Sequence, residues 1–254
     1  MTAPVAFDPR RYTVIAHGDL LLWNPVTPAH IDDWMAGLGL SAESRVLDVG
    51  CGRGELLMRT VERTGCQGTG VDHLVPVVAA ARAEAERRGL DTRITLLAES
   101  FDANRFAPDT FDLAACIGAT HAVSDFEQAL RVLSRLVRPG GHLLVGEGYW
   151  RQDPPPEYLA FLGAEPDELL THEGNLSLAR TLGLEVVRSH RATEAEWSLY
   201  EDTYADNVLR FVSENPQDPE ADAMRRRIES WREAYLRWGR RTLGFGLYLL
   251  RRPR

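Results

Sequence analysis

The chain has 254 residues, a formal net charge of -8 at pH 7 and a hydrophobic content of 44%. This length suits one large domain with a substantial core, and the acidic balance argues against a nucleic-acid groove as the main function. All 29 basic residues are arginine, which excludes chemistry that needs a lysine, such as a Schiff base or a P-loop.

The cysteines and the hydropathy of the chain favour a cytoplasmic protein. Cys51, Cys66 and Cys116 form no C-x-x-C pair, so we expect neither a disulfide framework nor structural zinc. Residues 1–20 lack the charged start and apolar core of a secretion signal, and no apolar run reaches about 18 residues. We therefore expect no membrane span.

Residues 1–40 precede the first strong strand pattern. Thr27 followed by Pro28 is typical of a helix start, and apolar residues at helical spacing predict a helix over 29–38. We expect Trp34 of this helix to lie in the core.

The strongest pattern is a strand, a glycine turn and a helix that begin at residue 45. Residues 45–49 form a short apolar run of the kind found in buried parallel strands, and Gly50, Gly52 and Gly54 follow. Glycine allows a sharp turn and lets a ligand approach the main chain. The stretch therefore predicts a nucleotide-binding βαβ unit.

Two acidic residues indicate which cofactor this turn suits. A dinucleotide fingerprint needs a small residue where the chain has Glu55, and Asp48 stands two residues before the first glycine. A carboxylate here repels pyrophosphate and attracts S-adenosylmethionine (SAM), which carries a sulfonium and an ammonium group. The stretch V-L-D-V-G-C-G-R-G-E resembles the first motif of class I SAM-dependent methyltransferases. We therefore expect SAM against Asp48 and the three glycines; a chance strand, turn and helix is the alternative.

The second strand, predicted over 67–71, ends at Asp72, which lies 22 residues after Gly50. A carboxylate at this position accepts hydrogen bonds from both ribose hydroxyls of a bound nucleoside. A surface acid at a strand end is the alternative. His73 follows and is a candidate to cover one face of the adenine.

The third strand, predicted over 93–97, leads into the expected adenine site. The resemblance implies an acid that receives the adenine amino group, and by length this acid aligns with Ser100, one place after Glu99. Either Glu99 shifts to make the contact, or the Ser100 hydroxyl and a backbone carbonyl replace it. Phe101 keeps the apolar position expected against the ring.

The fourth strand is predicted over 111–117, and the fifth over 142–147 after a proline-glycine-glycine turn that again resembles the family. The carboxyl ends of these strands lie at the edge of an open α/β sheet where ligands bind. We expect Ile117 and Gly118 to contact the cofactor there.

His121 is the first candidate for a general base, because it follows the fourth strand and would lie near the sulfonium methyl. A histidine that only caps the helix predicted over 124–137 is the alternative. Glu147 and Tyr149 are the next candidates for the catalytic role. Trp150 is a candidate for the acceptor pocket.

The chain then departs from the minimal fold. We expect cap insertions at about 151–172 and 192–240, the second of them containing helices over 194–214 and 220–239 before a last strand over 242–250. Aromatic residues of the cap are candidates to wall the acceptor pocket; packing between helices is the alternative role. These residues are His17, Trp23, Trp197, Tyr200 and Tyr204; Tyr12 is a candidate for a lid over the cofactor.

The predicted fold is α/β, with a Rossmann-like seven-stranded, mostly parallel sheet, an antiparallel last strand and helices on both faces. Residues 1–40 form a cap segment and residues 41–254 the SAM-binding domain. The resemblance covers about residues 12–252 and extends to a bacterial group of little-characterised small-molecule methyltransferases. It implies in-line methyl transfer from SAM to a small molecule; a SAM-using cyclisation and a SAM-sensing protein are the alternatives. We expect no metal and no nucleic-acid partner, and a monomer or homodimer.

Overall fold

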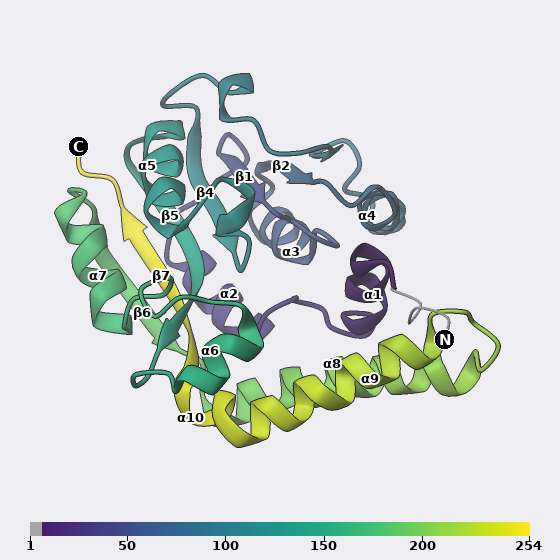
Figure 1. Cartoon of the computed structure of the whole chain (residues 1–254). Coiled ribbons are helices and arrows are strands. Elements are labelled where there is room, and N and C mark those ends of the chain that lie inside the picture. The colour runs from purple at the N-terminus through teal and green to yellow at the C-terminus, as the bar shows by residue number, and fades with distance from the viewer. Residues whose placement is uncertain (1–6) are drawn as a thin grey trace.

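The computed structural model describes residues 7–254, which form one sheet flanked by helices and a pair of long helices, α8 and α9, that project from it (Figure 1). The strands are β1 (Arg45–Val49), β2 (Gln67–Asp72), β3 (Ile94–Ala98), β4 (Phe111–Ile117), β5 (Val137–Trp150), β6 (Glu185–Arg191) and β7 (Leu243–Arg251). The α-helices are α1 (Pro9–Ala16), α2 (Pro28–Ala36), α3 (Glu55–Thr64), α4 (Val75–Arg87), α5 (Phe126–Leu136), α6 (Pro156–Leu162), α7 (His172–Thr181), α8 (Glu194–Glu214), α9 (Ala221–Ala234) and α10 (Arg240–Thr242). The short helical segments are η1 (Ala103–Arg105), η2 (Thr120–Ala122) and the π-helix η3 (Tyr235–Gly239).

The strands are hydrogen-bonded in the order β3-β2-β1-β4-β5-β7-β6. β7 runs antiparallel to β5 and β6, and the other neighbouring strands are parallel. This confirms the predicted Rossmann-like sheet with an antiparallel last strand. The strand order reverses between β1 and β4, so a ligand site is expected at their carboxyl ends.

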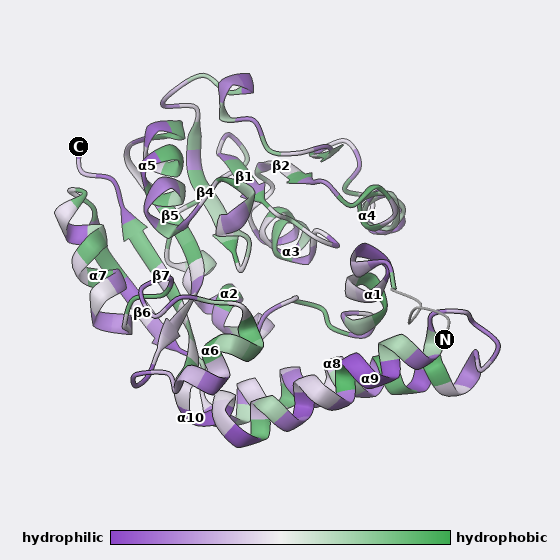
Figure 2. Cartoon of the chain, viewed as in Figure 1, coloured by the Kyte–Doolittle hydropathy of each residue, from purple (hydrophilic) through white to green (hydrophobic). Residues whose placement is uncertain are grey.

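Two apolar clusters lie on the two faces of the sheet. Val46 belongs to one cluster, whereas Leu47 and Val49 belong to the other, because successive side chains of a strand point to opposite faces. In Figure 2 the central strands are coloured mainly as hydrophobic, whereas α9 mixes polar and apolar residues. None of the helices within residues 7–254 combines the length and the apolar composition needed to cross a membrane.

Helix α1 was not predicted, although a local signal was present. The Asp8 side chain caps it by accepting a hydrogen bond from the amide of Arg10, and Pro9 takes the first helical position. Figure 1 shows α1 beside α8 and α9, and a third apolar cluster joins the three helices. The buried members of this cluster are Tyr12, Ala16, Ala205, Val208, Val212, Ala221, Met224 and Ile228.

Strand β5 is longer than the predicted strand over 142–147. Val137 already pairs with Phe111, and the register then shifts before regular pairing resumes at His142. The predicted turn at 138–141 is thus an irregularity within one strand, since both sides of it pair with β4.

Candidate active site

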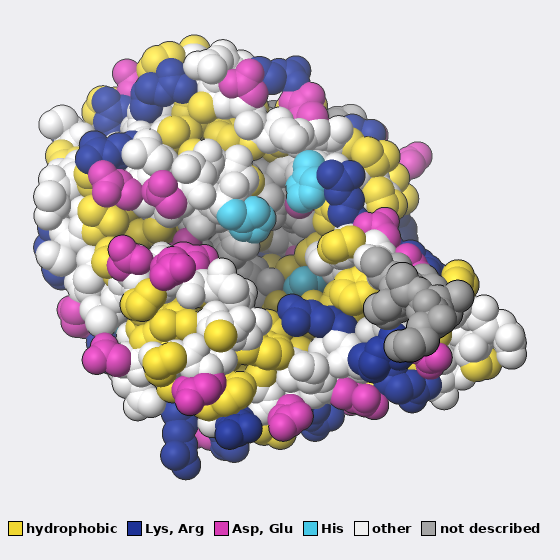
Figure 3. Space-filling view, in the orientation of Figure 1, with side chains coloured by type: hydrophobic (Ala, Val, Ile, Leu, Met, Phe, Trp, Pro, Cys, Tyr) yellow, Lys and Arg dark blue, Asp and Glu magenta, His cyan; other side chains and the backbone are white. Residues whose placement is uncertain are grey.

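A cavity of about 480 Å³ opens at the carboxyl ends of β1, β2 and β4, at the switch point of the sheet. Figure 3 shows a hollow in this face with histidine side chains around it. The cavity brings together predicted residues from all parts of the chain. These are His17, Trp23, Asp48, Gly50, Gly52, Asp72, His73, Ile117, Gly118, His121 and Tyr200.

The glycine loop after β1 lets the main chain line this cavity. Gly50 and Gly52 have φ angles of 70° and 51°, in the left-handed region that favours glycine. A Cβ atom on Gly50 would lie 2.2 Å from the Cβ of Ala119, so a side chain does not fit there. The amide of Gly50 donates to the carbonyl of Val71 at 2.8 Å, which holds the loop against β2.

Asp72 ends β2 with its carboxylate directed at the glycine loop. Its Oδ2 accepts a hydrogen bond from the amide of Gly52 at 3.0 Å, and its Oδ1 accepts one from the amide of Leu74 at 2.9 Å. A carboxylate has about four lone-pair sites. Two hydroxyl groups can therefore still bind an Asp72 carboxylate that the main chain has already oriented.

Asp48 lies in β1 beneath the glycine loop and is almost fully buried. Burial, with the negative charge of Asp72 as the second cause, raises the pKa of Asp48 to about 8. A nearby positive charge would reverse this effect and favour the carboxylate. The cavity floor is therefore electrostatically suited to a cationic ligand and unsuited to a phosphate.

Glu55 also lines the cavity, and the sequence reasoning gave it no role there. It begins α3, where a carboxylate interacts favourably with the helix dipole. Its oxygens lie 3.3 Å from Arg59 Nη1 and 2.6 Å from Arg88 Nη2. The i,i+4 spacing to Arg59 was a local signal, whereas the bond to Arg88 depends on the packing of α4.

Three aromatic side chains predicted as cap residues form one wall of the cavity. The His17 ring stacks on Trp23 with a centroid distance of 4.4 Å. His17 Nδ1 lies 2.8 Å from the carbonyl of Thr13 and therefore carries the proton, so Nε2 accepts from the Tyr200 hydroxyl at 3.0 Å. Burial lowers the pKa of His17 to about 4, so this histidine is neutral near pH 7.

His121 lies on η2, is exposed and is one of the residues that line the cavity. Its neighbour Thr120 donates its hydroxyl to Glu147 Oε2, and the amide of Gly148 donates to Glu147 Oε1 at 2.8 Å. Burial raises the pKa of Glu147 above its usual range. Glu147 is not among the residues that line the cavity, and its bond to Thr120 ties η2 to β5. Its catalytic role stays a prediction.

Of the predicted adenine residues, His73 lines the cavity, whereas Glu99, Ser100 and Phe101 lie outside its lining. Glu99 forms an ion pair with Arg105, and Ser100 is exposed. Phe101 stacks with Phe106 at a centroid distance of 6.2 Å. Their contact with adenine stays a prediction.

The remaining candidates lie elsewhere in the fold. Tyr149 and Trp150 line a second cavity of about 480 Å³, on the side of α7 and β6. Trp197 packs against Phe245 in the sheet core, and Tyr204 packs edge-on against His17. Gly54 caps α3 instead of lining the main cavity. The sequence placed Trp197 and Tyr204 on the correct helix, whereas Tyr149 and Trp150, expected beyond the end of the fifth strand, belong to the longer β5. Side-chain direction depends on packing.

The geometry defines a class of protein. The glycine loop lies at the switch point, Asp72 is oriented at the end of β2, and the buried Asp48 favours a cation. Together they suit a sulfonium nucleoside. Asp48, the glycine loop and Asp72 are the residues that would hold SAM.

Comparisons with known proteins agree with this class. A family model described as a methyltransferase domain matches residues 46–141. A SAM-dependent methyltransferase from Geobacter sulfurreducens, solved with S-adenosyl-L-homocysteine, is 31% identical, with a TM-score of 0.88 and coverage of 98% of this chain and 100% of that one. The protein YjhP of Escherichia coli (strain K12) is 30% identical over 95% of this chain and 98% of its own length. A ubiquinone biosynthesis O-methyltransferase from Aeromonas salmonicida (strain A449) is 30% identical, over 56% of this chain and 57% of the relative.

The chain belongs to the SAM-dependent methyltransferases, and its cofactor is SAM. This confirms the predicted family and the choice of SAM over a dinucleotide. That choice rested on Asp48 and Glu55, which are both buried acids in the cavity lining.

Proposed function

We propose that the protein transfers the methyl group of SAM to a small-molecule acceptor held between the glycine loop and the cap. The supporting observation is the cavity itself, because about 480 Å³ is a usual volume for a small-ligand site. The N-terminal segment and Tyr200 of α8 form a wall beside the loop, so little room remains for a macromolecule.

Bound SAM supplies an activated methyl group on its sulfonium. In the transfer the acceptor atom forms a bond to the methyl carbon, the carbon–sulfur bond breaks, and its electron pair returns to sulfur. The main tasks of this chain are then alignment and exclusion of water. The aromatic wall of His17, Trp23 and Tyr200 serves both tasks, since it is rigidly hydrogen-bonded and stacked.

His121 is the group that we assign to remove a proton from an acceptor that arrives protonated. It lies in the cavity lining, it is exposed to solvent for onward proton release, and an imidazole nitrogen can accept a proton from an acceptor group. Glu147 and Thr120 act as positioning residues for η2. We place the reaction in the cytoplasm, because the three cysteines are buried free thiols.

The deciding experiment is acceptor-dependent release of S-adenosylhomocysteine across a panel of small hydroxy-, amino- and thiol-bearing compounds. We expect release with part of the panel, and we expect His121→Gln to reduce it by about 10²- to 10⁴-fold while SAM affinity is unchanged. SAM binding without release from any compound would contradict the proposal and favour a cyclisation or a sensing function. Unchanged turnover in His121→Gln would contradict the role of His121 as the base. It would leave the proposed methyl transfer itself unaffected.

A further inference from the structure

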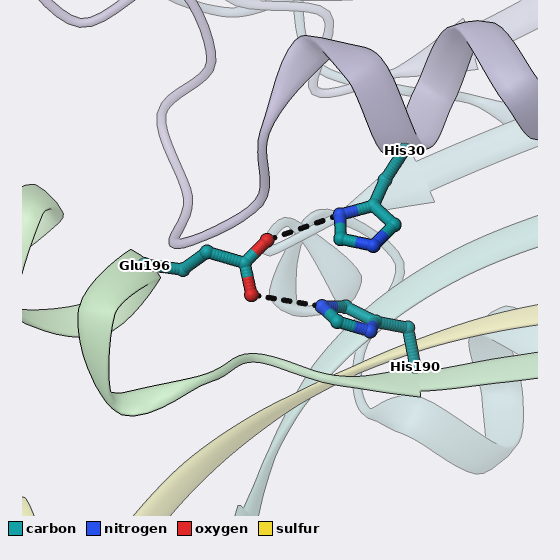
Figure 4. Close-up of side chains that lie close together, drawn as sticks. All are labelled: His30, His190 and Glu196. Atoms are coloured by element: carbon teal, nitrogen blue, oxygen red, sulfur yellow. Dashed lines mark hydrogen bonds and ion pairs between the residues drawn. The ribbon is translucent and has the colours of Figure 1, made fainter.

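Two histidines and one glutamate from distant parts of the chain meet beside the base of the cap (Figure 4). His30 belongs to α2, His190 to β6 and Glu196 to the first turn of α8. His30 Nδ1 lies 3.0 Å from Glu196 Oε1, and His190 Nε2 lies 2.9 Å from Glu196 Oε2. All three ligand atoms lie within 4.8 Å of one another.

The carboxylate of this cluster is fixed before any ligand arrives. Glu196 completes the capping box of α8, in which its Oε2 accepts hydrogen bonds from the amide of Thr193 at 2.8 Å and from the Thr193 hydroxyl at 2.9 Å. Such outer contacts orient a ligating carboxylate.

The other carboxylate oxygen of Glu196, Oε1, lacks a well-formed hydrogen bond within residues 7–254. It is buried, and His30 Nδ1 is near it. That nitrogen also lies 3.0 Å from the hydroxyl of Thr27, so a proton on it can serve only one of the two oxygens. The imidazole rings of His30 and His190 are in contact, with a centroid distance of 3.9 Å.

We propose that His30, His190 and Glu196 bind one divalent first-row transition-metal ion, best matched by Zn²⁺. Two imidazoles and a carboxylate form a three-ligand zinc set, and solvent completes the tetrahedron. Tetrahedral ligands at zinc distances lie about 3.3 Å apart. The nitrogen–oxygen distances of 3.0 and 2.9 Å run to different oxygens of Glu196, and the three ligand atoms lie within 4.8 Å of one another, so the side chains must adjust to surround one ion.

The proposed site lies outside the cavity used for methyl transfer, because its three residues are not among those that line it. It ties α2, β6 and α8 together. Glu196 and Tyr200 are four residues apart and so share one face of α8, which links the metal to the aromatic wall of the cavity. The proposal departs from the expectation, drawn from the sequence, that the protein needs no metal. His30 is 160 residues from its nearest partner in sequence, so no local spacing signals the site.

The test uses the full chain after dialysis against EDTA, titrated with Zn²⁺ by calorimetry and with Co²⁺ by visible absorption. We expect one ion per chain, tetrahedral Co²⁺ bands and a rise in melting temperature on adding Zn²⁺. His30→Asn and His190→Asn should each weaken binding at least tenfold. His142→Asn, a change to a half-buried histidine on β5, is the matched control and should bind as the unaltered chain does.

The choice of variants keeps the result interpretable. Glu196→Gln also disturbs the capping box, so the test relies on the histidine variants. The His30 side chain is 35% exposed, and its replacement leaves the N-terminal cap of α8 intact. Absence of Zn²⁺ binding would overturn the proposal. So would binding that persists unchanged in both histidine variants, or a Co²⁺ spectrum of the octahedral aqua ion. None of these readouts depends on methyl transfer.

Discussion

Asp72 is the side chain that the main chain orients most directly for the predicted cofactor contact. Amides of Gly52 and Leu74 fix its two carboxylate oxygens, and each oxygen retains a free acceptor position. We expect Asp72→Asn to weaken SAM binding by roughly 1.5–3 kcal/mol, as for the loss of a hydrogen bond to a charged group. Calorimetric titration with SAM measures this change. Asp33→Asn, which alters an exposed acid paired with Arg188, is the control and should have no effect.

Asp48 predicts opposite pH dependences for binding and stability. Its folded-state pKa of about 8 lies above an unfolded value of about 3.9. Its contribution to the unfolding free energy of the ligand-free protein is therefore fully present below about pH 3.9 and is lost as the pH rises through about 8. SAM, being cationic, binds the ionised form, so its affinity should rise by up to about tenfold per pH unit toward pH 8.

Asp48→Asn isolates this effect from other titrating groups. Urea unfolding of the ligand-free protein between pH 5 and 9 should show that the variant loses less stability than the unaltered chain over this range. SAM titrations over the same range should show a weaker pH dependence in the variant. Parallel curves for the two proteins would contradict the role of Asp48.

At the scale of elements, η2 depends on a contact from β5. The hydroxyl of Thr120 donates to Glu147, and this bond fixes the segment that carries His121. We expect Thr120→Val to lower turnover by on the order of tenfold to hundredfold, because a small displacement of a catalytic group is costly. Thr120→Ser keeps the hydroxyl and should restore most of the rate. Equal rates in both variants, measured with an identified acceptor, would show that the bond does not position His121.

Helices α1, α8 and α9, which we call the cap here, are held together by their own apolar cluster. Met224 is fully buried in it, so Met224→Ala should cost about 2–5 kcal/mol of stability. Because the cluster is separate from the sheet core, we expect hydrogen exchange to quicken mainly in α1, α8 and α9 and SAM affinity to fall. Leu133→Ala, an equally buried change in a sheet cluster, is the comparison. Identical exchange patterns for the two variants would contradict an independently opening cap.

At the scale of the whole molecule, the proposed cofactor cavity is lined by the edge of the sheet and by residues of α1 and α8, so we expect ligand binding to link these parts. A ligand present at one hundred times its dissociation constant stabilises a protein by about 2.7 kcal/mol. We expect S-adenosylhomocysteine to raise the melting temperature accordingly, and the increase to shrink in Asp72→Asn at the same ligand concentration. Calorimetric scans of both proteins provide the measurement.

The sequence by itself determined the sheet and the cofactor. The glycine loop, Asp48 and Asp72 are local features, because a sharp turn needs glycine at fixed places and strand ends in a parallel sheet share one edge. The central strands and the last strand were likewise visible as short runs of apolar residues.

Only the tertiary structure decided which side chains share a cavity. Tyr149 faces a second cavity although its strand ends at the ligand edge, and Trp197 packs in the core while Tyr200, three residues later, reaches the cavity. The meeting of His30 with His190 depends on where α2 packs against β6. Side-chain direction and contacts between distant segments are set by packing of the whole chain, and no pattern of nearby residues encodes them.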